Sequence, residues 1–565
     1  MKRNPGTFAS KQFDLLVVGG GIYGAFAAWD AALRGLSVAL VEKSDFAGAT
    51  SANSLKIVHG GLRYLQNADI HRMRESVRER TNLMRIAPHL IHPLPFMIPT
   101  HGLGKKSRLA MSMALRFTEL ISKDINCLSD PQKHIPEGHI VSRDVCRKFI
   151  QGISDEGLSG GAIWYDCQIY NSERLIISIL RSAASEGAEL ANYLEVKRFL
   201  IQSGRAMGVE VEDRMTGDRF KIRSRCILNA CGPWSRHIRN LLMGDYVEQG
   251  TPHVKAIDII VKRPIFQGVA VGLESKKLSQ NRLKNRGSRF YFFVPWRDAT
   301  MVGTYYTGFH GFPDNARVEE SELMEFLGEV NEICPHANIT PNDISFLHLG
   351  LLPKKSVYAD DGNFEPSRKY VIWDHQKNDG LDGVVSLEGV KYTTARLVVE
   401  KAIDRILEKL GKPPIPCRTS ITPIFGGNIQ SFSRFLDETT REKSSVLEPK
   451  IIRHLVLNYG TEYIRLIKYA EEDPGLLNPV GKSQSVIRSE IVHGIREEMG
   501  IKLTDLLFRR TDLCSLGNPG DNGIEISAEI ASKEFGWDQV RVINELYETK
   551  NNFPPITHLS LSPIK

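Results

Sequence analysis

The sequence predicts an α/β fold followed by a helical region, and three observations carry this prediction. An apolar run over residues 13–18 precedes closely spaced glycines and a helix-forming segment over 25–33. Alternating, aromatic strand patterns occupy residues 289–306, and beyond residue 430 the patterns are mostly helical. A buried strand, a glycine turn and a helix in this order are typical of a Rossmann-like unit with a parallel sheet.

Length and composition limit the class of protein. A chain of 565 residues is too long for one hydrophobic core, so two or three domains are expected. The 42% apolar and 25% charged residues are those of an ordinary globular protein. No run of about 18 apolar residues predicts a spanning helix, and no secretory signal is visible, so we expect a cytoplasmic location.

Cysteine, histidine and charge patterns exclude several kinds of site. The eight cysteines form no C-x-x-C pair and the sixteen histidines no H-E-x-x-H, so we expect no metal. The net charge of +7 slightly favours anionic substrates or lipid surfaces. It gives no reason to expect a nucleic-acid partner.

Three spaced glycines, Gly19, Gly21 and Gly24, lie at the predicted strand-to-helix turn. Such glycines allow a tight turn, close approach of a pyrophosphate and packing of the helix on the strand. A second strand over 38–41 ends in Glu42, whose carboxylate can accept hydrogen bonds from an adenosine ribose. Alone, the glycines could form a turn in another α/β protein. With strand, helix and acid in register they predict dinucleotide binding, with FAD and NAD both open.

Residues 49–65 form a second distinctive stretch, rich in small, hydroxylated and glycine residues. These allow backbone to lie against a flat ligand, and Lys56, His59 and Arg63 add positive charge. Taken alone, the stretch could equally be a polar loop. Together with the glycine turn it resembles the N-terminal signature of the FAD-dependent glycerol-3-phosphate dehydrogenases and oxidases, whose pattern is close to ATS..S.K.IHGGLRYL. This resemblance implies FAD rather than NAD.

Further segments extend the resemblance over nearly the whole chain. Residues 229–234 are similar to the family's N-A-[TC]-G-P-W, residues 389–396 to its G-G-K-[LY]-T-T-x-R, and 493–511 to its C-terminal helices. Chain order and resemblance together predict a Rossmann-like FAD-binding domain, an antiparallel β-sheet substrate domain and a C-terminal helical domain. The expected ranges are 1–80 with 140–245 and 355–412 for the first, 81–139 with 246–354 for the second, and 425–565 for the third.

The resemblance implies a set of cofactor-binding residues spread over the chain. They are Gly19, Gly21, Ile22, Tyr23, Gly24, Glu42, Lys43, Thr50, Ser51, Ser54, Lys56, His59, Gly60, Gly61, Val196, Ala230, Gly232, Trp234, Gly389, Lys391, Tyr392 and Thr393.

Oxidation of a secondary alcohol by a flavin needs a base for the hydroxyl proton and cations that fix an anionic substrate. Arg63, Tyr64, Arg368 and Lys391 match family positions near the substrate. Asp258 is the fifth candidate catalytic residue. For each cation, a surface salt bridge is the alternative that the residues alone leave open.

Several positions depart from the family pattern in the expected substrate pocket. Leu352 replaces the arginine of G-V-R-P, and Asp258 replaces the histidine of K-G-S-H. Tyr305 and Tyr306 replace the last two residues of G-T-T-D, and the second glycine of G-G-K is a valine. Loss of a charged phosphate contact should cost about 1.5 to 3 kcal/mol of binding, unless a residue such as Lys354 replaces it.

The expected function is FAD-dependent oxidation of sn-glycerol 3-phosphate to dihydroxyacetone phosphate, with electrons passed on from the reduced flavin. The altered positions keep open another polyol, sugar or phosphorylated hydroxy compound as substrate. A non-catalytic flavin-binding subunit is a more remote alternative. Quinone, dioxygen and a carrier protein are all open as electron acceptors, and a homodimer is possible.

Two helical patterns carry expectations about the surface. In residues 71–90 the charged side chains, Glu79 and Arg80 among them, are expected on the solvated face. In residues 105–121 one apolar face follows a basic N-terminal cluster. That helix can lie in a membrane interface or pack on its own domain. The family resemblance favours peripheral association with the inner face of the cell membrane. The apolar face comprises Leu109, Met113, Phe117 and Leu120.

Overall fold

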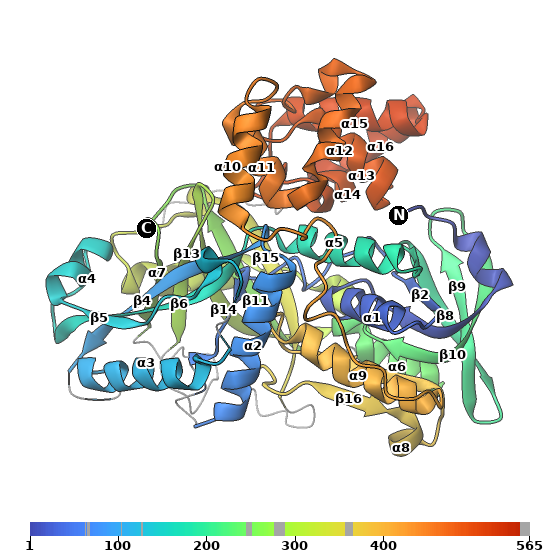
Figure 1. The fold of residues 1–565 in the computed structure, drawn as a ribbon, viewed down its shortest axis with the longest axis horizontal. Helices are drawn as coiled ribbons and strands as arrows, with labels where there is room; N and C mark the ends of the chain where they lie inside the picture. Colours follow the sequence, from blue (N-terminus) through green and yellow to red (C-terminus); the bar gives the residue numbers. More distant parts are fainter. Residues whose placement is uncertain are drawn as a thin grey trace.

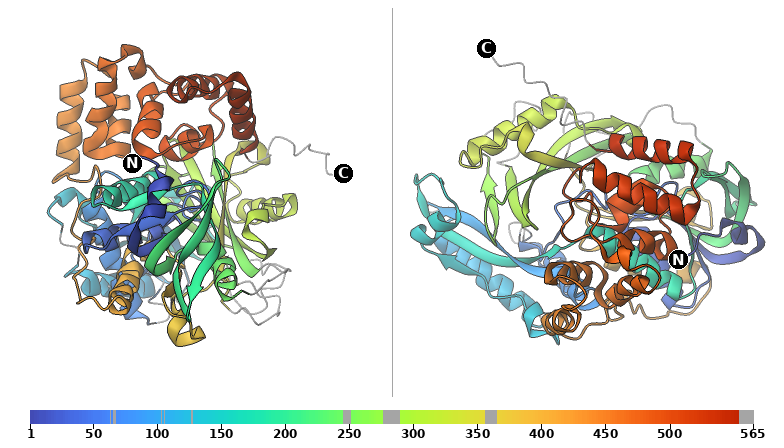
Figure 2. Two further views of the ribbon diagram at one scale, coloured as in Figure 1. Left: turned by 90° about the vertical axis from the view of Figure 1, so that its right-hand side faces the viewer. Right: turned by 90° about the horizontal axis from the view of Figure 1, so that it is seen from above.

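The computed structural model describes residues 1–62, 64, 68–102, 104, 106–125, 128–244, 251–275, 289–355 and 365–553. Two β-sheets lie side by side, and a helical domain lies across them at one end (Figures 1 and 2). This arrangement confirms the predicted fold class.

The first sheet is mostly parallel and has the order β16-β17-β10-β1-β2-β7. Strands β9 and β8 continue from β10 as an antiparallel extension. Successive residues of β1 enter different cores: Leu15 and Val17 pack under the helices α1, α5 and α9, while Leu16 and Val18 pack against β8, β9 and α6. Both faces are therefore buried, which explains the continuous apolar runs. The strands are β1 (Gln12–Val18), β2 (Val38–Val41), β7 (Glu189–Ala191), β8 (Leu194–Gln202), β9 (Arg205–Asp213), β10 (Arg219–Asn229), β16 (Val371–Asp374) and β17 (Val384–Glu388).

The second sheet has the order β15-β11-β14-β13-β12-β4-β6-β3, with β5 paired to β6. It is antiparallel except where β12 meets β4. Its strands are β3 (Ile57–Val58), β4 (Ile91–His101), β5 (His139–Val141), β6 (Leu158–Ile169), β11 (Thr251–Val261), β12 (Ala270–Glu274), β13 (Phe290–Trp296), β14 (Ala299–Gly311) and β15 (Ile344–Pro353).

The predicted domain boundaries need two changes. Range 140–245 was assigned as a whole to the FAD-binding domain, but β6 pairs with β4 along its full length in the second sheet. Strand β3, inside the range 1–80, joins the same sheet through Cys167 and Gln168. The sequence shows no composition change at these crossings, because the chain passes between the two sheets through buried strands on both sides.

The helices cover the sheets from outside (Figure 1). They are α1 (Ile22–Leu33), α2 (Ile70–Ile86), α3 (Arg108–Ser122), α4 (Arg143–Phe149), α5 (Ser172–Ser185), α6 (Ser235–Met243), α7 (Glu320–Ile333), α8 (His375–Asp379) and α9 (Ala395–Lys409). Short 3-10 turns are Pro5–Ser10, Pro131–Lys133, Gly232–Trp234, Pro313–Asn315, Pro341–Asp343, Gly460–Glu462, Tyr469–Glu471 and Pro474–Leu477. None of the described helices combines the length and apolar character that crossing a bilayer requires.

Helix α2 corrects the expectation about its charged residues. Met73 and Val77 point inward as predicted, but Glu79 and Arg80 are buried as well. Glu79 receives a two-point hydrogen bond from Arg396 of α9, at 2.7 and 2.8 Å. Arg80 bonds Asp166 of β6 at 3.0 Å. Helical periodicity alone assigns these two charged residues to the solvent-exposed face. They can be buried because each has an oppositely charged partner that is distant in the sequence.

The C-terminal domain is helical, as predicted. Its helices are α10 (Phe432–Lys443), α11 (Pro449–Tyr459), α12 (Tyr463–Lys468), α13 (Arg488–Glu498), α14 (Leu503–Asp505), α15 (Asp521–Phe535) and α16 (Gln539–Asn551), with a π-helical turn over Leu506–Arg510. Buried charges join it to the first sheet's region. Arg174 of α5 meets Glu498, and Asp45 after β2 meets both Arg509 and Arg510.

Candidate functional site

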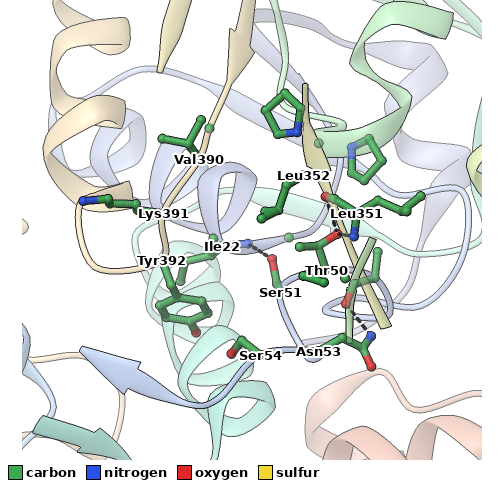
Figure 3. Close-up of a pocket in the computed structure, with 18 of the residues that line it drawn as sticks. Ile22, Thr50, Ser51, Asn53, Ser54, Leu351, Leu352, Val390, Lys391 and Tyr392 are labelled. Atoms are coloured by element: carbon green, nitrogen blue, oxygen red, sulfur yellow. Dashed lines mark hydrogen bonds between the residues drawn. The ribbon is translucent and has the colours of Figure 1, made fainter. Parts of the chain in front are cut away.

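A cavity of about 1000 Å³ runs between the two sheets and is walled by residues of both. This volume is at the upper end of the roughly 300–1,000 Å³ of small-molecule sites. Figure 3 shows part of the wall, where Ser51 approaches Ile22 and Thr50 approaches Leu351. Segments that are hundreds of residues apart therefore share one site.

The glycine turn forms one end of the cavity. Gly19 has a φ of +109°, and a Cβ atom there would lie 2.7 Å from the carbonyl oxygen of Ala230. Gly21 is the N-cap of α1, and the Ile22 N–H donates to the Ser51 hydroxyl at 3.1 Å. The start of α1 therefore opens onto the cavity with its positive dipole end, where phosphate groups bind favourably.

Glu42 stands at the end of β2 in the same wall. Its carboxylate accepts hydrogen bonds from the Gly20 N–H at 2.7 Å and the Ser44 N–H at 2.9 Å. Burial raises the pKa of this carboxyl, and these two bonds work against that rise. The side chain is held in place and faces the cavity, as binding of ribose hydroxyls requires.

Two cross-links hold the middle of the cavity. The Thr50 hydroxyl donates to the Leu351 carbonyl and accepts from the Leu351 N–H, both at 3.1 Å, which ties the 49–54 loop to β15. The Tyr23 hydroxyl of α1 donates to the Lys391 carbonyl at 2.7 Å. Each link joins elements that are distant in the sequence, so hydrogen bonds within the protein hold this part of the wall together.

The structure brings together most of the predicted site residues. Those in the cavity wall are Gly19, Gly21, Ile22, Tyr23, Glu42, Lys43, Thr50, Ser51, Ser54, Lys56, His59, Gly61, Tyr64, Val196, Ala230, Gly232, Trp234, Asp258, Arg368, Gly389, Lys391, Tyr392 and Thr393.

Three predicted site residues are not among these residues of the cavity wall. Gly24 lies behind the wall, where its missing side chain lets α1 pack on the Gly19 backbone. Gly60 also lies behind it, with its N–H bound to Asp166. Arg63 falls outside the described residues.

Lys56 lies in the wall, but its charge is compensated. Its ammonium donates to Glu173 at 2.8 Å and to the Ser172 hydroxyl at 2.7 Å, both on α5. We expected this charge to serve a ring or an anion. In the structure, the Lys56 ammonium is instead paired with the buried carboxylate of Glu173.

The end of the cavity toward the second sheet carries several charged groups. The Lys391 ammonium lies 3.9 Å from the centre of the Tyr64 ring. Arg368 pairs with Glu365 at 3.4 Å and is half exposed. Asp258 of β11 is buried and accepts a hydrogen bond from the Thr304 hydroxyl at 2.7 Å. Cations, an aromatic ring and a carboxyl group therefore line the same cavity.

Sequence reasoning missed four wall residues here: Trp164, Asp166, Arg289 and Thr304. Burial opposes ionisation of Asp166, but its contacts with His59 and Arg80 outweigh it and lower the pKa of this carboxyl. Trp164 and Asp166 are two residues apart on β6, so period-two alternation could have placed both on one face. It could not have said which face meets the cavity.

A glycine turn at a helix start, an acid after the second strand and a second sheet closing a long cavity define a dinucleotide-binding oxidoreductase. The sequence comparisons identify the oxidoreductase family to which the chain belongs. The chain belongs to the FAD-dependent oxidoreductase family, whose model matches residues 14–376. A second model, the C-terminal domain of alpha-glycerophosphate oxidase, matches residues 417–542. FAD is therefore the cofactor, as predicted. That the glycine turn, Glu42 and the 49–54 loop bind it stays a prediction, with which their place in the cavity wall agrees.

Individual relatives match this chain over nearly its full length. The chain is 30% identical to a glycerol-3-phosphate dehydrogenase of Synechocystis sp., covering 95% of each chain. It is also 30% identical to the aerobic glycerol-3-phosphate dehydrogenase of Bacillus subtilis, covering 94% of this chain and 92% of that one. The structure of a glycerol-3-phosphate dehydrogenase from Bacillus halodurans complexed with FAD has a TM-score of 0.74 at 24% identity, covering 97% and 95%. At this level of sequence identity, the similarity to the Bacillus halodurans structure is evidence for the fold alone.

Proposed function

We propose that the protein oxidises the secondary alcohol of sn-glycerol 3-phosphate, giving dihydroxyacetone phosphate. The observation that carries this proposal is the continuity of the cavity, which joins the FAD-binding end to a space lined by Lys391, Tyr64 and Asp258. The names of the full-length relatives support the choice of substrate. When bound, FAD supplies the acceptor for two electrons.

The chain's own residues bind and orient the substrate in this proposal. Lys391, held over the Tyr64 ring, offers a point charge to an anionic oxygen. Arg368 offers a planar guanidinium, suited to a two-point phosphate contact. Lys354 is buried in the same wall, two residues after Leu352, and takes over from the arginine expected there. Arg63 is a further phosphate ligand in this proposal.

Stopped-flow bleaching of the flavin under anaerobic conditions tests the substrate. Glycerol 3-phosphate should bleach the flavin absorbance of the FAD-loaded enzyme faster than glycerol or sugars do at equal concentration. Bleaching by another compound, with none by glycerol 3-phosphate, would reject the assignment. If no compound bleaches a fully loaded flavin, the non-catalytic subunit is the better description.

One observation favours a different hydroxylated substrate. Leu352 is part of the wall where the family has an arginine, and Tyr306 lies in the same wall. An apolar side chain and a phenol suit a less anionic polyol better than a second phosphate contact does. Competition by inorganic phosphate distinguishes the two, because it should slow bleaching by a phosphorylated substrate and leave bleaching by a neutral polyol unchanged.

We propose in addition that α3 binds the surface of an anionic membrane. Its four predicted apolar residues are 44–72% exposed, whereas Leu115 faces the protein. Arg108, Arg116 and Lys123 are exposed on the same helix. An apolar stripe beside basic side chains is typical of an interfacial helix. Figure 1 shows α3 on the side opposite the C-terminal domain, so that domain does not cover it.

Vesicle co-sedimentation tests this surface. The protein should sediment with vesicles containing anionic lipid and less so with neutral vesicles or in high salt. A triple variant with Leu109→Ser, Phe117→Ser and Leu120→Ser should stay in the supernatant. The matched control is Val540→Ser with Ile543→Ser, because both are similarly exposed, at 67% and 58%, on α16. Equal binding by both variants would reject α3 as the contact.

We propose a lipid-soluble quinone as the electron acceptor, since membrane binding brings the enzyme to it. Turnover with a short-chain quinone should then exceed hydrogen peroxide release in air. A peroxide yield equal to substrate consumed would identify an oxidase. Light scattering after size exclusion would test the expected homodimer.

A further inference from the structure

We propose that Asp258 is the catalytic residue that takes the proton of the substrate hydroxyl, and that Thr304 is its positioning residue. The inference rests on the proposed alcohol oxidation, and it assigns the base that this reaction needs. Asp258 lines the same cavity as Lys391 and Tyr64.

The local backbone explains how this carboxyl comes to face the cavity. The pairing of β11 with β14 shifts register opposite Asp258, where two residues of β14, Gly303 and Thr304, stand against this one residue of β11. Along β11, Ile257 and Ile259 enter the core on one face, so alternation places the Asp258 side chain on the other face. Opposite it, Gly303 has no side chain, and a Cβ there would collide with the Asp258 carboxylate. Gly303 therefore leaves the space that the carboxyl occupies, and Thr304 orients it by a hydrogen bond of 2.7 Å.

Three other carboxylates of the cavity wall are already engaged. Asp166 is held by Arg80 and by the Gly60 N–H, and Glu365 pairs with Lys355 and Arg368. Glu42 bonds two backbone N–H groups at the other end of the cavity. Among the described residues Asp258 forms no salt bridge, and its hydrogen-bond partner is a hydroxyl. A carboxyl without a cation partner can change its charge during a reaction.

The surroundings set the pH at which Asp258 ionises. Burial raises its pKa to about 7, while Thr304 and the charge of Lys56 act in the other direction. Lys56 is paired with Glu173. His348 of β15 is the residue paired with Asp258 across the strands, and burial lowers its pKa to about 3, so it is neutral near pH 7. The base form of Asp258 is therefore the minor form below about pH 7 and the major form above it.

The reaction balances with these groups. The O–H bond of the substrate breaks and its proton goes to the Asp258 carboxylate. When bound, FAD would supply the acceptor for the hydrogen and the electron pair of the carbinol C–H bond. The carbon–oxygen double bond forms, so the substrate loses two electrons and the protein gains one proton, which it returns to solvent before the next turnover.

Single-turnover flavin bleaching as a function of pH tests the assignment. At saturating substrate and pH 8, Asp258→Asn should bleach about 10²–10⁴ times more slowly than wild type. The wild-type rate should fall below an apparent pKa near 7, and the variant should lose this acid limb. Asp298→Asn is the control, because this exposed carboxylate lies in the turn between β13 and β14 and should change neither rate nor profile.

A second variant separates catalysis from folding. Thr304→Val removes a hydrogen bond that favours the ionised carboxylate, so the acid limb should move up by about half to one pH unit while FAD stays bound. An Asp258→Asn enzyme that keeps the wild-type rate and acid limb would overturn the inference. So would an unmoved limb in Thr304→Val. If no alcohol bleaches the wild-type flavin, the proposed function itself fails.

Discussion

At the scale of single residues, Gly19 is the position where backbone geometry is most restrictive for cofactor binding. Its φ of +109° and its approach to Ala230 exclude any side chain without movement. Gly19→Ala should lower the free energy of unfolding by about 1–3 kcal/mol and reduce the FAD content of the purified protein. Urea unfolding and flavin absorbance per chain measure the two effects.

Gly35→Ala is the matched control for this substitution. Gly35 has a φ of +75°, but a methyl group on its Cα would meet no atom within 4 Å, and the residue lies outside the cavity wall. The Gly35→Ala variant should therefore lose stability through backbone strain alone and keep its FAD. Full FAD content in Gly19→Ala would contradict the role given to this turn.

Lys391 provides the second residue-scale prediction. Replacing it with methionine keeps most of the side-chain volume and removes the charge above Tyr64. The apparent dissociation constant for a phosphorylated substrate should rise roughly 10- to 100-fold, since a hydrogen bond to a charged group contributes about 1.5–3 kcal/mol. Substrate dependence of flavin bleaching measures this constant. Lys401→Met, on α9 outside the cavity wall, should leave it unchanged, and an equal effect of both changes would contradict the prediction.

At the scale of elements, the buried ion pair between α2 and α9 is the contact that helical periodicity placed wrongly. Glu79 and Arg396 are at most 3% exposed. Glu79→Gln would leave Arg396 with Glu400 as its remaining acidic partner. Loss of one partner of a buried pair should lower the free energy of unfolding by about 3 kcal/mol.

Urea denaturation measures this loss, with Glu438→Gln as its control. Glu438 pairs with Arg434, four residues earlier on the same helix, in an exposed position on α10. That change should cost less than about 1 kcal/mol. An equal loss of unfolding free energy in the two variants would mean that burial does not strengthen the contribution of the α2–α9 ion pair to stability.

The elements themselves were predictable where one local pattern determined them. The strand over 13–18, the helix after Gly21 and the aromatic strands near 290 and 300 came from periodicity and turn residues alone. The assignment of β6 to the second sheet did not, because strand pairing depends on partners more than fifty residues away. The same limit applies to Lys56, whose compensation by Glu173 joins residues 117 positions apart.

Among the candidate site residues, those within motifs were predictable and those on open strands were not. Glu42 follows a recognisable strand, so its place in the wall could be expected. Asp258 entered through a comparison of family patterns, and only the structure shows that the bulge of β14 and the missing side chain of Gly303 leave room for its carboxyl. Trp164 and Arg289 are ordinary strand residues in sequence, and only the arrangement of the second sheet gives them a place in the site.

At the scale of the whole molecule, the C-terminal domain is joined to the cofactor site through Asp45. This residue lies three positions after Glu42, in the cavity wall, and bonds Arg510 at 2.7 and 2.9 Å and Arg509 at 2.5 Å. Figure 2 shows the helical domain lying across the sheets rather than apart from them. Because the loop after β2 contacts both, docking of this domain and the position of Glu42 are coupled.

The pH dependence of this junction follows from the pKa of Asp45. Burial alone would raise it, but Arg510 and Arg509 outweigh burial and lower it from 3.8 to about 2. The folded-state pKa is therefore below the unfolded one. The contribution of Asp45 to stability is present above about pH 4 and is lost as the pH falls toward 2. At about 1.4 kcal/mol for each pH unit between the two values, it amounts to about 2 kcal/mol.

Asp45→Asn should therefore unfold more readily than wild type at pH 6 and approach wild-type stability near pH 2. It should also release FAD faster, because the loop that carries Glu42 loses its anchor to the C-terminal domain. Urea unfolding at several pH values and the rate of flavin release measure the two effects. Glu548→Gln, which removes an exposed pair with Lys502 in the C-terminal domain, should change neither. A stability difference that stays constant from pH 6 to pH 2 would show that the charge of Asp45 does not hold this junction, and unchanged flavin release would show that domain docking and cofactor binding are independent.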